Sequence, residues 1–128
     1  MLTELLTAVL LVFALANPRI AVTATGPKPE SEVESRFARA PWFMIYDPGT
    51  RAWQPVDNSQ ASRRPGGAGR EAAETLARRG VKIVITGQCG PNALRALASA
   101  GIKVFQASDC TVAEALRDYQ AGKLREIK

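Results

Sequence analysis

The side chains of this sequence with the clearest chemical potential are the thiols of Cys89 and Cys110. Cys89 stands in the run from Gly87 to Pro91, where glycine lets the backbone approach a ligand closely and proline suits the first position of a helix. The exposed amides of a helix start favour anions and stabilise a thiolate, so the run fits a soft-metal ligand or an activated nucleophile. A plain strand-to-helix turn with a small buried cysteine fits the same residues, and the run alone leaves both interpretations open.

Cys110 lies in a similar position one predicted strand later. It precedes Thr111, and the spacing of Thr111 and Glu114 is that of a capping box at a helix start. Neighbouring parallel strands lie about 4.8 Å apart and end at one edge of a sheet, so we expect both thiols to converge there on one ion or cluster, as stabilised thiolates. The glycine run 66–69 leads to the same edge and completes a predicted anion pocket, although loops between strands and helices that simply need small residues, with solvated arginines, fit the same sequence. Three arginines are expected nearby: Arg36, Arg63 and Arg64.

Several classes of catalytic site are absent from the sequence. It contains no histidine, which excludes a histidine-based triad, an imidazole metal ligand and a histidine base for Cys89. It has no phosphate-binding loop with Gly-Lys-Ser/Thr, and the glycine run 66–69 does not follow a strand as a dinucleotide fingerprint would. Two cysteines also cannot form a disulfide scaffold. The sequence therefore favours a binding protein over an enzyme.

The net charge of +5 indicates anionic partners. Residues 1–17 contain one charged side chain, Glu4, so the rest of the chain carries +6. Such a balance can attract nucleic acid, an anionic membrane or an anionic small ligand. Lysine and arginine are scattered, however, and the few aromatic residues do not interleave with a basic stripe. We therefore expect neither nucleic acid nor a membrane as the partner.

The order of hydrophobic patterns predicts an α/β fold. The β-branched run 83–85 suits a strand buried on both faces, and Pro48 with Gly49 indicates the turn of a hairpin. Helices alternate with single strands in the second half, which requires parallel strands with right-handed crossovers. We expect a mixed sheet of about five strands flanked by helices. The expected strands are 20–24, 42–46, 51–56, 82–85 and 102–105; the expected helices are 70–79, Pro91 to Gly101 and Thr111 to Gly122; a polar loop spans 57–69 and a basic tail follows Gly122.

Residues 1–17 differ from the rest of the chain. Leu5 to Ala16 is almost continuously apolar, but it is shorter than the ~20 residues of a membrane span. It fits the apolar part of a signal peptide or a weak anchor, although no lysine or arginine precedes Arg19. An extra helix and a start codon assigned too early are the other interpretations, and we favour the last because the first strand begins immediately. The chain is divided into a leader, residues 1–17, and one domain, residues 18–128.

Six short motifs occur in a fixed order along the chain: Arg19 to Val22, Ser35 to Ala40, Asp57-Asn58, Gly67 to Gly69, Gly87 to Ala93 and Ala100 to Val104. With this ordered set, residues 19–124 resemble the dinitrogenase iron–molybdenum cofactor-binding family, most of all its small single-domain orange-protein branch. The resemblance implies a ribonuclease H-like α/β fold without nuclease function. It also implies non-enzymatic binding or carriage of an anionic metal–sulfur cluster. In that branch the cluster is a molybdenum–copper sulfide, and an iron–molybdenum or iron–sulfur cluster is the alternative.

The resemblance also places the cluster among glycine loops and one arginine. The cofactor-binding residues that it implies are Arg36, Gly67, Ala68, Gly69, Gly87, Gln88, Gly90 and Asn92. Cys89 and Cys110 are not general family ligands, and their role as soft ligands or sulfide neighbours is our own hypothesis. Ala38 stands where the family usually has glycine, and some nitrogenase-related members use a histidine that is absent here.

A cytoplasmic location and partners in cluster assembly or cell division complete this interpretation. The residues are also compatible with two other functions. A cluster-free protein-interaction module would share the fold without binding metal. A dithiol redox protein would use both cysteines in a reversible disulfide.

Overall fold

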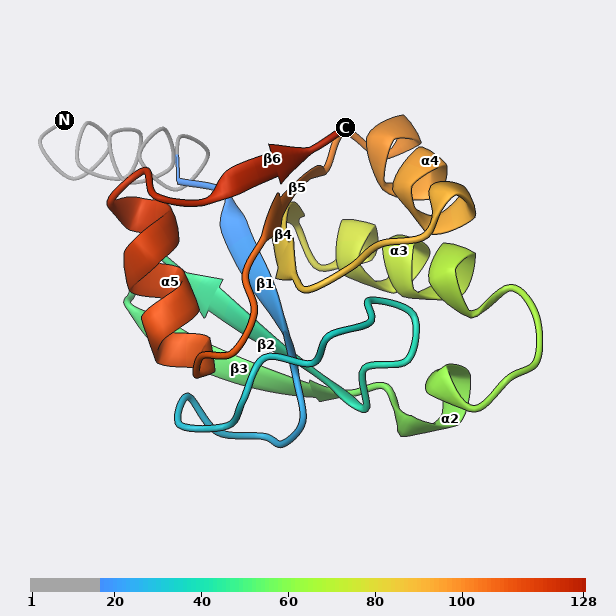
Figure 1. Cartoon of the computed structure of the whole chain (residues 1–128), viewed down its shortest axis with the longest axis horizontal. Coiled ribbons are helices and arrows are strands. Elements are labelled where there is room, and N and C mark those ends of the chain that lie inside the picture. Colours follow the sequence, from blue (N-terminus) through green and yellow to red (C-terminus); the bar gives the residue numbers. More distant parts are fainter. Residues whose placement is uncertain (1–16) are drawn as a thin grey trace, which may run out of the picture.

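The computed structural model describes residues 17–128, and the order of its elements follows the predicted α/β pattern (Figure 1). The strands are β1 (Arg19–Ala24), β2 (Trp42–Asp47), β3 (Ala52–Asp57), β4 (Val81–Thr86), β5 (Lys103–Gln106) and β6 (Arg125–Ile127). The helices are α2 (Ser59–Ser62), α3 (Ala68–Arg78), α4 (Pro91–Ser99) and α5 (Val112–Gln120). Apart from Asn17, the predicted leader lies outside the described residues. Among residues 17–128, no helix is both long and apolar enough to cross a membrane.

All the strands belong to one mixed sheet with the order β3-β2-β1-β4-β5-β6. β1, β4 and β5 are parallel neighbours, with Val22 beside Ile85 and Val84 beside Val104. The hairpin of β2 and β3 adds antiparallel strands next to β1. The carboxyl ends of β1, β4 and β5 therefore meet at one edge, as predicted. We call it the carboxyl edge, and the opposite edge, where these strands begin, the amino edge.

Two segments differ from the prediction. Residues 125–127, expected as part of a basic tail, form β6, which pairs antiparallel with β5 and makes the sheet six-stranded instead of five-stranded. Ile127 packs against the core, but a strand this short, with charged neighbours, has no detectable hydrophobic period. The predicted polar loop 57–69 contains the one-turn helix α2. The buried side chain of Asn58 precedes that helix and donates a hydrogen bond to the carbonyl of Ala40 (2.9 Å).

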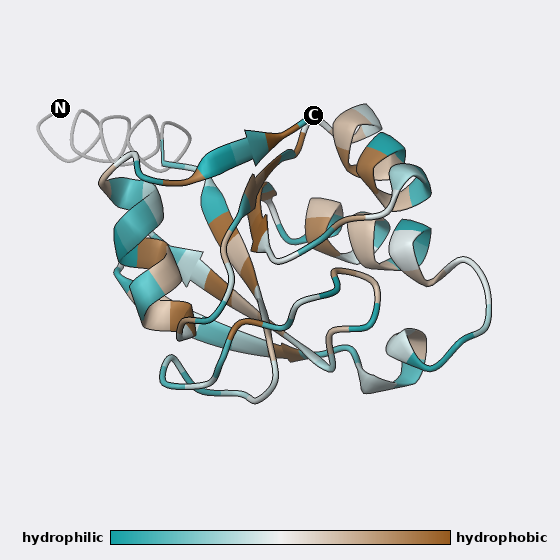
Figure 2. Ribbon diagram, viewed as in Figure 1, coloured by the Kyte–Doolittle hydropathy of each residue, from teal (hydrophilic) through white to brown (hydrophobic). Residues whose placement is uncertain are grey.

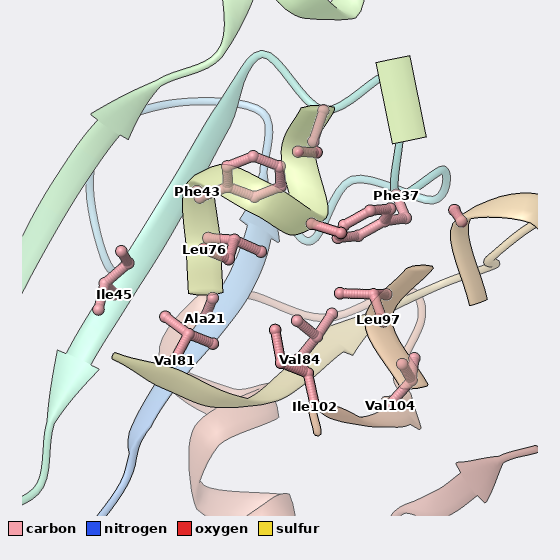
Figure 3. Packing of buried hydrophobic residues seen from close by; sticks show 14 of the residues in the cluster. Ala21, Phe37, Phe43, Ile45, Leu76, Val81, Val84, Leu97, Ile102 and Val104 are labelled. Carbon is pink, nitrogen blue, oxygen red and sulfur yellow. The ribbon is translucent and has the colours of Figure 1, made fainter. Parts of the chain in front are cut away.

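Helices cover both faces of the sheet, α3 and α4 on one and α5 on the other (Figure 1). Side chains alternate along a strand, so Ala21 of β1 joins the apolar cluster under α3 and α4 while Val22 joins the cluster under α5. Apolar residues are accordingly concentrated in the strands and on the inner sides of the helices (Figure 2). Figure 3 shows the first cluster, where Phe37 from the loop after β1 lies close to Phe43 and Leu97. The Phe37 and Phe43 ring centroids are 5.7 Å apart.

The predicted ends of α4 and α5 are confirmed by the backbone. Gly101 and Gly122 follow these helices with φ of 75° and 72°, in the left-handed region that glycine adopts without strain. Each helix therefore stops where the sequence indicates. The two crossovers bring α4 and α5 back along the sheet, so both helices begin at the carboxyl edge.

Candidate functional site

One loop segment crosses the carboxyl edge and contacts both cysteine loops. We call residues 31–40 the crossing segment. The amide of Val33 donates a hydrogen bond to the carbonyl of Cys110 after β5 (3.0 Å). The amide of Phe37 donates to the carbonyl of Gln88 after β4 (2.9 Å). The crossing segment, the turquoise loop that runs across the ends of β1 and β4 in Figure 1, therefore links the two loops in which the sequence places the cysteines.

Two buried hydroxyl groups fasten the crossing segment to the sheet. Thr23 in β1 and Thr86 in β4 are fully buried, and their Oγ1 atoms lie 2.9 Å apart. Thr23 Oγ1 also lies 2.8 Å from the carbonyl oxygen of Glu34, and the amide of Glu34 donates to the carbonyl of Thr23 (2.9 Å). A buried hydroxyl destabilises the fold unless it is hydrogen-bonded. These contacts therefore hold the crossing segment firmly across the ends of β1 and β4.

Gly87 begins the loop after β4 and leaves no space between that loop and the crossing segment. A Cβ at Gly87 would lie 2.6 Å from the carbonyl oxygen of Ser35 and 2.7 Å from its Cα. Gln106 of β5 donates from Nε2 to the Gly87 carbonyl (3.0 Å), and Arg36 pairs with Gln88 in an isolated parallel bridge. Glycine at this position is therefore required for the close approach of the two backbones.

The first turns of α3 and α4 pack against each other at the same edge. A Cβ at Gly69 would lie 2.7 Å from Cβ of Ala93 and 3.7 Å from Cβ of Ala38, so only small residues allow this contact. Gly67 and Gly90 are the N-cap residues, and neither has a side chain to bond the first-turn amides. Such amides carry partial positive charge and attract anions. Two uncapped helix starts therefore lie together on the face of the sheet that α3 and α4 cover.

The start of α5, next to Cys110, differs from the starts of α3 and α4 because its first-turn amides are capped and carboxylates surround it. Thr111 Oγ1 accepts a hydrogen bond from the amide of Glu114 (3.1 Å), and Glu114 Oε1 accepts one from the amide of Thr111 (3.1 Å), which confirms the predicted capping box. Hydrogen bonds from Thr111 lower the pKa of Glu114, so this carboxylate is charged at neutral pH. A cavity of about 280 Å³ beside Cys110 is lined by carboxylates and, among the described residues, by no lysine or arginine. Its carboxylates are Glu32, Glu34 and Asp109. This part of the edge disfavours anions.

The structure places the two cysteines against opposite faces of the sheet. Cys89 packs on the apolar cluster under α3 and α4, and Cys110 packs on the cluster under α5. Both thiols are free and partly buried. The edge therefore brings their loops together without bringing both sulfur atoms to one surface.

Both thiols are protonated at neutral pH. Burial raises the pKa of Cys89 to about 11. Burial, with the nearby charges of Glu114, Asp118 and Asp109, raises the pKa of Cys110. The raised pKa values contradict the predicted stabilised thiolates, because burial of each sulfur disfavours its charged form.

Of the arginines expected near the anion pocket, Arg36 keeps its charge available. It is exposed and forms no ion pair within residues 17–128. Arg64 pairs with Glu71 at 2.5 Å, and the charge of Arg63 acts on Asp57. The Glu71 carboxylate therefore offsets the charge of Arg64, whereas Arg63 forms no ion pair within residues 17–128 and acts on Asp57 only from a distance.

Arg39 positions the loop before α3, a role that the sequence does not indicate. The Nη1 atom of Arg39 donates to the carbonyls of Ser62 (2.8 Å) and Arg64 (2.7 Å), which ties that loop to the crossing segment. In the sequence, an arginine that binds distant backbone carbonyls looks the same as any solvent-exposed arginine in a polar stretch. The available signal was the pair of apolar residues Val33 and Phe37 in this polar stretch, whose burial makes the stretch part of the core.

The donor set of the site suits a preformed anion better than a bare cation. Among residues 17–128, no three His, Cys, Asp or Glu side chains converge as metal ligands, whereas a structural zinc site uses about four. The groups that border the two helix starts are backbone amides and the exposed residues Arg36, Gln88 and Asn92. All of these groups can donate hydrogen bonds, and one of them, Arg36, carries a positive charge. An anionic cluster with its own sulfide ligands would therefore fit them.

Residues 18–122 match the family described as dinitrogenase iron-molybdenum cofactor. The chain belongs to this family. Among solved structures it is similar to the apo form of the orange protein from Desulfovibrio gigas, with 40% sequence identity and a TM-score of 0.83 over 87% of this chain and 93% of that one. It is also similar to a NifB-like protein from Thermotoga of the DUF35 family, with 34% identity and a TM-score of 0.78 over 85% and 92% of the two chains.

A third structure, of a dinitrogenase-like protein from Methanocaldococcus jannaschii, has 13% identity and a TM-score of 0.66 over 88% of this chain and 96% of that one, so that likeness is one of fold. Among functionally curated proteins, none matches this chain. The predicted family is thus confirmed. Membership of it, together with the likeness to the orange protein, indicates a protein of the metal-cluster-binding kind.

Proposed function

We propose that this protein binds and carries an anionic metal–sulfur cluster, without catalysing a reaction, at the carboxyl edge beside α3 and α4. The observation that supports this most is the contact between two uncapped helix starts at Gly69 and Ala93. The exposed residue Arg36 pairs with Gln88, two residues before the N-cap of α4. An anion bound there replaces water on amides that have no partner within their own helices.

The cluster would be held by hydrogen bonds and charge instead of covalent bonds from the protein. Sulfide ligands of a metal cluster accept hydrogen bonds, and a charged donor roughly doubles the strength of such a bond. The amides at the starts of α3 and α4 would bond the sulfides, and the guanidinium of Arg36 would offset their charge. The residues proposed to border the cluster are Arg36, Gly67, Ala68, Gly69, Gly87, Gln88, Gly90 and Asn92.

The two cysteines have different roles in this proposal. Cys89 precedes the N-cap of α4 and would be a neighbour of the cluster, or a ligand if binding displaces its proton. A pKa of about 11 makes that displacement costly at neutral pH. Cys110 lies on the other face, beside carboxylates that repel an anion, and we therefore leave it outside the site.

The identity of the cluster is the finer part of the proposal. We favour a molybdenum–copper sulfide because the chain resembles the orange-protein branch, and an iron–molybdenum or iron–sulfur cluster is the alternative. The ribonuclease H-like topology, the cytoplasmic location and a partner in cluster assembly or cell division belong to the same proposal. Each of them rests on the resemblance and is open to separate test.

Anaerobic titration of the full chain with tetrathiomolybdate and copper(I) tests this function. We expect visible charge-transfer bands and a fixed metal-to-protein ratio that persists through gel filtration. Arg36→Gln should weaken uptake about tenfold, the effect of one charged hydrogen bond. Arg63→Gln, which removes a cation facing Asp57, is the matched control and should leave uptake unchanged.

The cysteine variants separate the remaining possibilities. If amides hold the cluster, both Cys89→Ser and Cys110→Ser keep most of the uptake. Complete loss in Cys89→Ser alone indicates direct ligation. No uptake by a protein with an intact unfolding transition would overturn the cluster function and favour the interaction module. A reversible disulfide between the two cysteines would favour the dithiol protein.

A further inference from the structure

Two side-chain hydrogen bonds join β6 to the loop after β4 at the carboxyl edge. Gln106, the last residue of β5, donates from Nε2 to the carbonyl of Gly87 (3.0 Å). Its Oε1 accepts a hydrogen bond from Nη2 of Arg125 in β6 (2.8 Å). Gln106 and Arg125 lie opposite each other in the register of β5 and β6, so strand pairing brings them together. We call them the Gln106–Arg125 pair.

The Gln106–Arg125 pair lies on the face of the sheet that carries the proposed cluster site. Side chains alternate along a strand, and Val104, two residues before Gln106, joins the apolar cluster under α3 and α4. Ile127, two residues after Arg125, packs against the same cluster, whereas Phe105 packs under α5. The pair therefore meets the loop after β4 on the side that α4 covers.

Arg125 determines which atom of the Gln106 carboxamide faces Gly87. A guanidinium group has donors only, so the carboxamide atom that it contacts must be the oxygen. The nitrogen is then directed at the Gly87 carbonyl. Arg125 is exposed and forms no ion pair within residues 17–128, so no carboxylate there competes for its guanidinium. The orientation of the carboxamide therefore depends on this one contact.

Gly87 is held between this pair and the crossing segment. A Cβ there would lie 2.6 Å from the Ser35 carbonyl oxygen, so the crossing segment fills the space on one side of the residue. The hydrogen bond from Gln106 directs the Gly87 carbonyl oxygen towards β5, which fixes the peptide that leads into Gln88 and the start of α4. Without this bond the peptide could turn its carbonyl oxygen towards a bound anion, which the oxygen would repel.

We propose that Gln106 is a positioning residue of the cluster site and that Arg125 acts through it. Gln106 fixes the first peptide of the loop that leads into α4, and Arg125 keeps the donating nitrogen of Gln106 in place. This role rests on the proposed carrier function and adds two residues to those proposed to border the cluster. It also gives β6 a part in the site, because Arg125 reaches Gln106 only when β6 pairs with β5.

Anaerobic titration of full-chain variants with tetrathiomolybdate and copper(I) tests this role. Gln106→Glu keeps an oxygen for Arg125 but offers Gly87 no donor at neutral pH. Its uptake should be about fivefold weaker than that of the parent, as expected for one lost hydrogen bond. Lys123→Met is the control for charge, because it removes an exposed cation near the start of β6 that forms no ion pair in the described part of the chain. It should leave uptake unchanged.

A double-variant cycle separates positioning from direct attraction by Arg125. Arg125→Met alone should weaken uptake about threefold, because the carboxamide loses its preferred orientation. In a Gln106→Leu background the same substitution should have no further effect, since no carboxamide remains to be oriented. Equal losses in both backgrounds would show that Arg125 attracts the anion directly and would overturn its role through Gln106.

Hydrogen exchange in the metal-free protein tests the loop independently of the cluster. Gln106→Leu should speed exchange of the Phe37 amide, which donates to the Gln88 carbonyl, about fivefold. The Val33 amide, which donates to the Cys110 carbonyl, is the internal control and should exchange as in the parent. Unchanged exchange at Phe37, or faster exchange there with uptake equal to that of the parent, would overturn the inference. If the parent takes up no cluster, the proposed function fails, while the exchange rates still decide whether Gln106 holds the loop.

Discussion

Replacing Gly87 by alanine is the sharpest test of how the site is built. The new Cβ would lie 2.6 Å from the Ser35 carbonyl oxygen, whereas ordinary van der Waals contact begins at 3.4 Å. Neither contact atom belongs to a flexible side chain, so the two backbones must separate by about 0.8 Å. The hydrogen bond from the Phe37 amide to the Gln88 carbonyl would then lengthen from 2.9 Å to about 3.7 Å and be lost.

The expected cost follows from these two effects. Overpacking by one methyl group costs about 1–3 kcal/mol, and the lost hydrogen bond adds about 1 kcal/mol. Gly87→Ala should therefore lower the free energy of unfolding by about 2–4 kcal/mol, measured by urea denaturation followed by circular dichroism. Cluster uptake should fall with it, because the displaced loop carries one of the two helix starts.

Gly90→Ala is the matched control for this substitution. Gly90 lies three residues away in the same loop, nothing lies within 4 Å of a Cβ built there, and its φ of −65° is allowed for alanine. It should cost less than about 1 kcal/mol. If Gly87→Ala is as stable as the parent within about 0.5 kcal/mol, the close contact with Ser35 does not hold the loop and the reasoning is refuted.

Three further outcomes are expected. Gly69→Ala should lower stability by about 1–3 kcal/mol in urea and weaken uptake, because the new Cβ lies 2.7 Å from Cβ of Ala93. Adding Ala93→Gly should cost less than the sum of the two single substitutions, since it removes the clashing Cβ; additive costs would contradict the contact. The free energy of unfolding should fall as pH rises from about 9 to about 11, because Cys89 loses its proton in the unfolded chain but retains it in the folded one. Cys89→Ala should make this fall less steep. If the dependence of stability on pH is the same in the variant, the thiol titrates normally and the prediction is wrong. Thr111→Ala should lower the free energy of unfolding by about 1 kcal/mol in thermal denaturation and leave metal uptake unchanged. A loss of uptake would place the start of α5 in the site.

The short-range patterns of the sequence were sufficient for most of the fold. A β-branched run, a Pro-Gly turn and the capping box at Thr111 each depend on interactions within a few residues, and the elements that they predict are present. β6 was not predicted, because its stability comes from pairing with β5, some twenty residues earlier, and not from a hydrophobic pattern of its own. The position of the crossing segment was not predicted for the same reason, since its hydrogen bonds join residues such as Phe37 and Gln88 that are distant in the chain.

The sequence by itself determined the α/β order, the family, and the meeting of both cysteine loops at the carboxyl ends of parallel strands, because connection rules and local periodicity carry that information. Only the tertiary structure decided that Cys89 and Cys110 pack on opposite faces, with raised pKa values, since the face on which a side chain lies depends on how each loop leaves its strand. It also decided where charge gathers. Residues as far apart as Arg19 and Lys82 meet at the amino edge because β1 and β4 are neighbours in the sheet, and no linear pattern records such a meeting.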